Sequence, residues 1–276
     1  MKRLLLISFV LILATTIHAA EVDTVVVYSN SMQKKINCVV IRPDAAKEPG
    51  DKKWPTVYLL HGYSGSYSNW IRKVPALKAY ADEWQLIIVC PDGDYSSWYF
   101  DSPVDASMKY ETYIANEVPA YIEEHYPAIR QANGRAISGL SMGGHGALFL
   151  AFRHPDIFGA CGSMSGGVNL YPFRNKFDIA KRLGDTIRNR KNWDEYSVMN
   201  VIEKKRPADS LAVIIDCGTD DFFYADNKAL HQKMMKLKIP HDYIERGGTH
   251  NWDYWGNAVS YQLLFFHRFF SKNVKP

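Results

Sequence analysis

The sequence predicts an α/β fold built on a predominantly parallel, eight-stranded sheet with helices on both faces. Short apolar segments alternate along the chain with longer helix-like segments, as is typical of parallel strands joined by helices. Several of the short segments are apolar almost throughout, and residues 56–60 are one example. Such runs are expected of strands that are covered on both faces.

Composition limits the classes of protein that this chain can belong to. It has 276 residues, of which 47% are hydrophobic, enough for the core of one sizeable domain. The formal net charge is +4, from 33 basic and 29 acidic residues, which provides no basic stripe for nucleic acid. We therefore expect no nucleic-acid partner. A local basic cluster is predicted to be a solvated helix face, and it consists of Arg182, Arg188, Arg190 and Lys191.

The first twenty residues have the features of a secretion signal. Lys2 and Arg3 give it a basic start, residues 4–17 are apolar, and Ala19-Ala20 offers a small-residue cleavage site. The apolar run is too short to span a membrane comfortably, although a retained N-terminal anchor stays open as an alternative. We expect a secreted or periplasmic protein with one domain over residues 21–276 and no membrane span.

Eight segments have the apolar character or the alternation of β-strands. The first two flank the polar turn Asn30-Ser31 and predict an antiparallel hairpin at the edge of the sheet. The predicted strands cover residues 22–29, 34–43, 56–60, 85–90, 136–141, 160–165, 211–217 and 242–245.

Helical patterns lie between these strands. The predicted helices cover residues 108–126, 142–154, 225–237 and 252–270, and the last is long and aromatic. Residues 170–207 are polar, rich in Arg, Lys and Asn, and contain no strand pattern. We interpret them as a small cap-like insertion and not as a second domain.

The four cysteines, Cys38, Cys90, Cys161 and Cys217, lie in or at the ends of apolar segments. Export permits disulfides with three possible pairings, and buried free thiols are the other interpretation. The spacings fit neither a zinc site nor a C-x-x-C motif, so no metal is expected.

The segment Gly139-Leu140-Ser141-Met142-Gly143 fits the pattern G-x-S-x-G. An apolar strand precedes it and an apolar helix follows, so a sharp turn between them would expose the Ser141 hydroxyl. The flanking glycines leave room where a side chain would clash. A serine in this context indicates nucleophilic catalysis, although a buried turn serine without a catalytic role is the alternative.

A serine nucleophile needs a base and an acid that orients the base. Asp220 and Asp221 follow the predicted strand 211–217, and His250 follows the strand 242–245 after a pair of glycines. The carboxyl ends of parallel strands meet at one edge of a sheet, so we expect these groups near Ser141. The order Ser, Asp, His is that of the α/β-hydrolase fold.

Two backbone N–H groups are candidates for the oxyanion hole. Met142 begins a helix, where free N–H groups and the helix dipole favour negative charge. The second donor is expected in the turn His61-Gly62-Tyr63 after the third strand, at the Tyr63 N–H.

Four segments carry a family resemblance: LLHG at 59–62, GLSMGG at 139–144, GTDD at 218–221 and GTHNW at 248–252. Together they resemble the esterase D / S-formylglutathione hydrolase-like esterases of the α/β-hydrolase superfamily, which include tributyrin, feruloyl and acetyl xylan esterases and mycolyltransferases. The resemblance runs from about residue 22 to residue 270. It implies that the acid is Asp221, three residues after the glycine that ends the strand, and it implies no cofactor.

The expected function is that of a secreted serine esterase acting on small-molecule or glycan esters of short acyl, acetyl or feruloyl type. The alternatives are an acyltransferase of the mycolyltransferase type and a catalytically inert binding protein on the same fold. Residues 94–99 resemble the loop of the family near the acyl pocket. The candidate pocket residues are His61, His145, Trp98, Tyr99 and Trp252.

Overall fold

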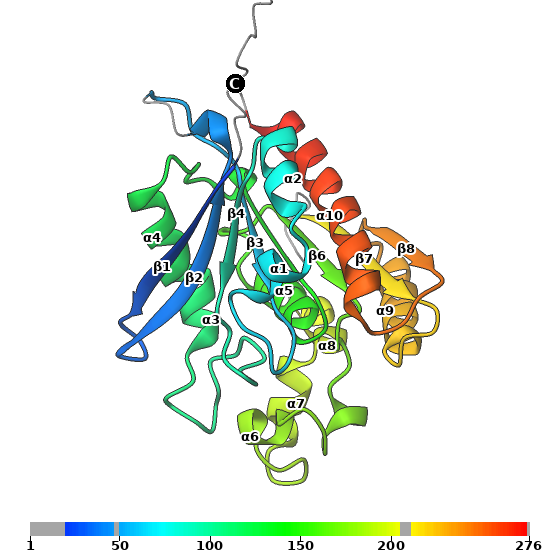
Figure 1. Ribbon diagram of the computed structural model, residues 1–276. Coiled ribbons are helices and arrows are strands. Elements are labelled where there is room, and N and C mark those ends of the chain that lie inside the picture. The colour runs from blue at the N-terminus through cyan, green and yellow to red at the C-terminus, as the bar shows by residue number, and fades with distance from the viewer. Residues whose placement is uncertain (1–19, 47–49, 205–210, 275–276) are drawn as a thin grey trace, which may run out of the picture.

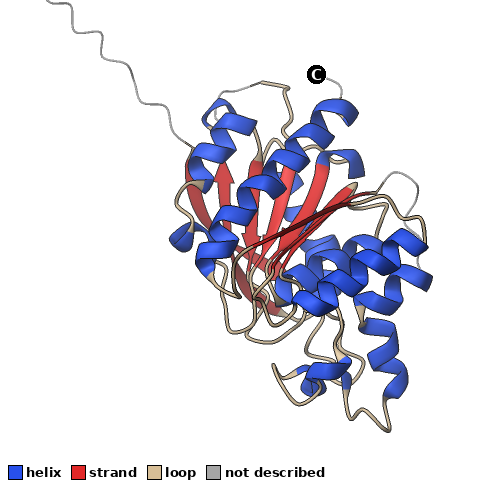
Figure 2. Ribbon diagram, turned by 90° about the vertical axis from the view of Figure 1, so that its right-hand side faces the viewer, coloured by secondary structure: helices blue, strands red, loops and turns tan. Residues whose placement is uncertain are grey.

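The computed structural model has a central twisted sheet with helices on both faces (Figures 1 and 2). It describes residues 20–46, 50–204 and 211–274. The predicted secretion signal, apart from Ala20, lies outside the described residues. The strands are β1 (Glu21–Ser29), β2 (Lys34–Arg42), β3 (Thr56–Leu60), β4 (Ile87–Pro91), β5 (Arg135–Gly139), β6 (Ala160–Met164), β7 (Ala212–Gly218) and β8 (Asp242–Arg246).

The eight strands lie in the order β1-β2-β4-β3-β5-β6-β7-β8. β1 and β2 form an antiparallel hairpin, and β2 pairs antiparallel with β4. All other neighbours are parallel. The predicted fold class, a predominantly parallel eight-stranded sheet between helices, is therefore confirmed. The carboxyl ends of the parallel strands lie at one edge, which faces the lower part of Figure 1.

Two layers of helices cover the sheet. One layer contains α1 (Asn69–Lys73), α2 (Leu77–Trp84) and α10 (Trp252–Asn273). The other contains α3 (Tyr110–Thr112), α4 (Val118–His125), α5 (Met142–Arg153), α8 (Val198–Lys204) and α9 (Tyr224–Lys236). Each layer closes a separate apolar core against the sheet, so the central strands β3, β4, β5 and β6 are buried on both sides.

The helix expected over residues 108–126 is interrupted. A π-helical turn, Tyr113–Glu117, separates α3 from α4, and Pro119 stands in the first turn of α4. Proline has no N–H to donate and its ring clashes with the preceding turn, so a regular helix cannot run through this point. The sequence pattern also missed α1 and α2.

The insertion at residues 170–207 contains a 3₁₀ turn, α6 (Ile179–Leu183), α7 (Arg190–Tyr196) and α8, and no strand up to residue 204, where the described part of it ends. α6 and α7 lie beyond the carboxyl ends of the strands (Figure 1). The four cysteines are buried free thiols. Burial raises the pKa of each thiol well above its ordinary value, so they act as apolar core residues. Among the described residues no helix is long and apolar enough to cross a membrane.

Candidate active site

The turn between β5 and α5 presents Ser141 in a strained backbone conformation. Its φ is 55° and its ψ is −116°, a region that residues other than glycine rarely adopt. The neighbouring glycines are required by close approach. A Cβ on Gly143 would lie 2.5 Å from the carbonyl oxygen of Leu60, and a Cβ on Gly139 would lie 2.5 Å from the backbone of Gly143. The end of β3 and the start of α5 can therefore pack this closely only because glycine has no side chain.

The Ser141 hydroxyl is joined to two side chains from other strand ends. His250 Nε2 lies 2.9 Å from Ser141 Oγ, and His250 Nδ1 lies 2.8 Å from Asp221 Oδ2. With Asp221 as a carboxylate, the Nδ1–H donates to it and leaves Nε2 free to accept from the hydroxyl. The second oxygen, Asp221 Oδ1, accepts from the backbone N–H of Phe223 at 2.8 Å, which fixes the carboxylate.

The two candidate acids differ in their surroundings. The Asp221 residue is only 6% exposed, whereas the Asp220 side chain is exposed to solvent and has no hydrogen bond to His250 among the described residues. Asp221 is therefore the carboxylate that the structure brings to His250. A buried carboxylate holds an imidazole more firmly than an exposed one because water does not screen the interaction.

Backbone contacts hold together the loop that carries Asp221 and the loop that carries His250. The N–H of Thr219 donates to the Arg246 carbonyl at 2.9 Å, and the N–H of Asp220 donates to the Gly248 carbonyl at 3.0 Å. Gly248 has a φ of +149°, a conformation that favours glycine, and a Cβ on Gly218 would lie 2.2 Å from the Gly248 oxygen. The glycines that flank both loops thus permit the contact that joins them.

The N–H groups of the two predicted oxyanion donors have no backbone acceptor in the described part of the chain. Met142 is the first residue of α5, so its N–H has no acceptor within the helix. The Tyr63 N–H has no acceptor in the part of the chain that the structure describes. Gly62, Tyr63 and Ser141 line the same cavity, and Met142 directly follows Ser141.

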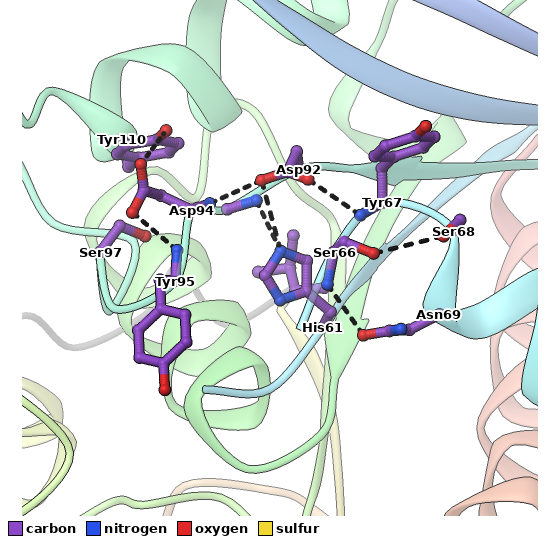
Figure 3. A network of polar contacts seen from close by, with 12 residues as sticks. His61, Ser66, Tyr67, Ser68, Asn69, Asp92, Asp94, Tyr95, Ser97 and Tyr110 are labelled. Atoms are coloured by element: carbon purple, nitrogen blue, oxygen red, sulfur yellow. Dashed lines mark hydrogen bonds and ion pairs between the residues drawn. The ribbon is translucent and has the colours of Figure 1, made fainter. Parts of the chain in front are cut away.

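His61 lies beside Asp92, and its Nε2 is 3.9 Å from Asp92 Oδ1 (Figure 3). It is fully buried, its Nδ1 lies 2.8 Å from the Gly62 carbonyl, and its Nε2 accepts from the N–H of Gly93 at 2.7 Å. Because Nε2 accepts in this contact, Nδ1 is the nitrogen that donates to the Gly62 carbonyl. His61 therefore joins the turn after β3 to the loop after β4.

A cavity of about 490 Å³ opens over Ser141 and His250. Of the predicted pocket residues, Trp252 lines it. His61, His145, Trp98 and Tyr99 are each at most 1% exposed and do not border it. The other aromatic side chains on its wall are Tyr63, Phe177, Phe222 and Trp255.

Two of these wall residues carry no motif that sequence reasoning could have used. Phe177 comes from the insertion and has a positive φ of 55°. Phe222 directly follows Asp221, is 52% exposed, and its ring centroid lies 4.2 Å from that of His250. The two phenylalanine rings are stacked, with an interplanar angle of 16°. The insertion therefore contributes directly to the wall of the pocket.

His145 is a core residue and not a pocket residue. Its Nε2 lies 2.9 Å from the Tyr196 carbonyl, and the rings of Trp98, Phe100 and Phe149 surround it. Burial lowers its pKa to about 3, so the imidazole is neutral near pH 7. In the described parts of the chain, no three His, Cys, Asp or Glu side chains gather in a way that could hold a metal ion.

The fold and the serine turn define an α/β-hydrolase, and comparison with known proteins gives its family. The family model described as "Putative esterase" matches residues 29–266, so the chain belongs to this family and is a carboxylic ester hydrolase. It is 24% identical to an acetyl esterase of Caldicellulosiruptor saccharolyticus over 250 aligned residues. The alignment covers 84% of this chain and 93% of that protein.

Solved structures of similar fold agree with this family. A ferulic acid esterase is 30% identical, with a TM-score of 0.78 over 91% of this chain and 98% of that one. An S-formylglutathione hydrolase of Staphylococcus aureus is 23% identical, with a TM-score of 0.76 over 90% of this chain and 99% of that one. The second likeness concerns the fold alone.

Proposed function

We propose that this protein is a secreted serine esterase that hydrolyses carboxylic esters through Ser141, His250 and Asp221. The observation that carries the proposal is the pair of hydrogen bonds at 2.9 and 2.8 Å that links the serine hydroxyl through the imidazole to a buried carboxylate. Such a chain activates a serine hydroxyl, which is a poor nucleophile on its own.

The proposed reaction has two steps. His250 Nε2 takes the proton of Ser141 as the oxygen attacks the ester carbonyl, and the N–H groups of Tyr63 and Met142 hold the oxyanion. The protonated His250 then gives that proton to the leaving alcohol, and the acyl group stays on Ser141. Water repeats the sequence on the acyl-enzyme and releases the acid. Asp221 keeps His250 in the tautomer that this exchange needs. The reaction requires no metal or organic cofactor.

The chemistry of the pocket suggests the class of ester. The aromatic wall formed by Phe177, Phe222 and Trp252 suits a planar or small acyl group more than a long flexible one. The ferulic acid esterase and acetyl esterase relatives support acyl groups of feruloyl or acetyl type. The signal-like residues 1–20 support export, and with it esters borne by extracellular glycans. Residues 21–276 would then be the mature, single-domain enzyme.

A panel of esters tests the proposal directly. It compares p-nitrophenyl acetate, p-nitrophenyl octanoate, methyl ferulate and acetylated xylan on the wild-type protein and on Ser141→Ala. We expect acetyl and feruloyl esters to be hydrolysed well and octanoate poorly. Ser141→Ala should lose at least about 10³-fold in turnover while its thermal unfolding is unchanged. A folded Ser141→Ala variant with wild-type turnover would overturn the proposal.

Two further readouts separate the alternatives. If added sugar alcohols capture most of the acyl group before water does, the enzyme is an acyltransferase. If no ester is hydrolysed and a fluorophosphonate does not label Ser141, the protein is an inert binding protein. Rapid labelling together with release of free acid supports the esterase.

A further inference from the structure

A fully buried carboxylate lies close to the active site without being part of the triad. Asp216 in β7 has no exposed surface and lies two positions after Ile214, on the face of the strand that α10 covers. The sequence gives no reason for a charge at this point in an apolar strand. Burying a carboxylate is costly unless specific partners hold it, so its partners indicate what it does.

Both oxygens of Asp216 are bound by side chains. The Tyr254 hydroxyl donates to Oδ1, and the Arg246 guanidinium donates to Oδ2 at 2.8 Å. The guanidinium also lies over the Tyr254 ring at 5.1 Å and over the Tyr261 ring at 4.4 Å. Burial raises the pKa of Asp216 overall, although Tyr254 and Arg246 both favour the carboxylate. The three side chains form one connected network.

The partners of Asp216 stand at the two ends of the loop that carries His250. Arg246 is the last residue of β8, and Tyr254 is in the first turn of α10. The N–H of Tyr254 also donates to the Asn251 side chain at 3.0 Å, which caps the helix directly after His250. One carboxylate therefore ties the start and the end of this loop to β7.

The middle of the loop rests on the same network. A Cβ on Gly248 would lie 2.2 Å from Cδ2 of Tyr254, so the ring packs directly against the bare backbone of this glycine. The Gly248 carbonyl in turn accepts the N–H of Asp220, in the loop of the acid. A shift of the Tyr254 ring would thus move both loops whose side chains meet in the hydrogen bond between His250 and Asp221.

We propose that Asp216, Tyr254 and Arg246 are positioning residues that set the place of the His250 loop and hence its distance to Ser141. None of the three lines the cavity over the nucleophile. The inference rests on the proposed function, because it assumes that His250 is the base. Displacing a catalytic group by about 1 Å can cost about 100-fold in rate, so a network outside the pocket can act strongly on turnover.

Tyr254→Phe tests the network because it removes one hydroxyl and keeps the ring against Gly248. The matched control is Gln262→Met. Gln262 lies two turns further along α10, is buried, and accepts from Ser138 Oγ at 2.9 Å. Both variants remove one buried hydrogen bond between α10 and the sheet. Only the hydrogen bond lost in Tyr254→Phe lies at an end of the His250 loop.

The expected result is a split between the variants. Tyr254→Phe should lower kcat for p-nitrophenyl acetate by about 10- to 100-fold, with KM within about threefold of wild type. Its labelling by a fluorophosphonate should slow by a similar factor, because that reaction also needs His250. Gln262→Met should keep both rates near wild type while its thermal unfolding midpoint falls about as much as that of Tyr254→Phe. Equal rates in the two variants would overturn the positioning role.

A second pair of variants serves if Tyr254→Phe does not fold. The Arg246 side chain is 24% exposed, so changes there are better tolerated. Arg246→Met should lower kcat. Arg246→Lys keeps the positive charge and should restore part of the lost kcat. If both variants have the kcat of wild type, the network does not position the His250 loop.

His250→Ala distinguishes a failure of the proposed function from a failure of the network. If it retains wild-type turnover, the proposed function fails. If it is inactive while Tyr254→Phe is fully active, only the network fails.

Discussion

Asp220 and Asp221 are adjacent in the chain but meet different surroundings. The Asp221 carboxylate is buried, accepts from the N–H of Phe223 at 2.8 Å and lies 2.8 Å from His250 Nδ1. The Asp220 side chain is exposed to solvent. In the proposed mechanism, only Asp221 of the two is in a position to stabilise the charge that His250 would gain from the serine proton.

Asp221→Asn should therefore be far more damaging than Asp220→Asn. The amide can donate to His250 Nδ1 and so favour the wrong tautomer, in which Nε2 carries the proton and cannot act as a base. We expect turnover of p-nitrophenyl acetate to fall by about 10³- to 10⁴-fold for Asp221→Asn and by less than about twofold for Asp220→Asn. Steady-state kinetics of the two folded variants measures the difference, and the opposite order would assign the acid to Asp220.

At the residue scale, the residues of the proposed triad are easier to recognise in the sequence than those that line the pocket. Ser141 and His250 are recognisable because each follows a strand and lies beside glycines that the close-packed loops require. Phe177 and Phe222 carry no such mark, since any large side chain at these positions would look the same in the sequence. Trp98 and Tyr99 are buried in the core and do not line the pocket. The sequence does not distinguish these cases, because aromatic side chains are common both in cores and in pockets.

At the scale of elements, the β5–α5 turn depends on the absence of side chains. A Cβ on Gly143 would lie 2.5 and 2.6 Å from the carbonyl oxygens of Leu60 and His61, which are backbone atoms that cannot move away easily. Gly256 in α10 is different, since its nearest neighbour would be a methyl group of Val74 at 3.6 Å. The two glycines form a matched pair for the same substitution.

Gly143→Ala and Gly256→Ala should change stability in opposite directions. Gly143→Ala should lower the free energy of unfolding by about 1–3 kcal/mol through overpacking, and should reduce turnover because β3 and α5 are pushed apart at the nucleophile. Gly256→Ala should raise the free energy of unfolding by up to ~1 kcal/mol through helix propensity, with turnover unchanged. Chemical denaturation and ester hydrolysis report both effects. A neutral Gly143→Ala would show that the turn tolerates a side chain.

The strands were predicted more accurately than the helices for a physical reason. A strand covered on both faces must be apolar throughout, and this pattern is read directly from segments such as β3 and β4. The short helices α1 and α2 have five and eight residues, too few for a helical repeat to stand out in the sequence, and they pack with α10 in one apolar core. The π-helical turn lies just before Pro119, which has no backbone N–H to donate. The spacing of apolar residues does not show how the backbone hydrogen bonds rearrange around this proline.

At the scale of the whole molecule, helices cover both faces of the sheet and enclose two apolar cores. One of these cores contains a buried histidine, His145, whose protonation affects the stability of the fold. His145 is a fully buried residue of α5, the helix that follows Ser141, and its side chain makes one hydrogen bond, to the Tyr196 carbonyl. Nδ1, its other ring nitrogen, has no partner among the described residues. Its protonation would place an unpaired charge in the core, so its titration is linked to unfolding of the entire domain.

The sign of that linkage follows from the pKa values. Burial lowers the pKa of His145 to about 3 in the folded state, against 6.5 for an ordinary histidine. Between these values the unfolded chain binds a proton that the folded protein does not. The stabilising contribution is therefore complete above about pH 6.5 and is lost as the pH falls towards 3. The slope from this one group approaches ~1.4 kcal/mol per pH unit.

His145→Gln should remove this part of the pH dependence, because an amide can donate to the Tyr196 carbonyl without titrating. The variant should be less stable than wild type at pH 7 as a result of imperfect packing among Trp98, Phe100 and Phe149. The difference should shrink, or change sign, as the pH is lowered to 4.5, because wild type alone must then keep a buried imidazole neutral. Urea unfolding of both proteins at several pH values measures the two slopes. Parallel slopes would mean that the folded protein accommodates a charged His145, and that the core around the nucleophile helix admits water.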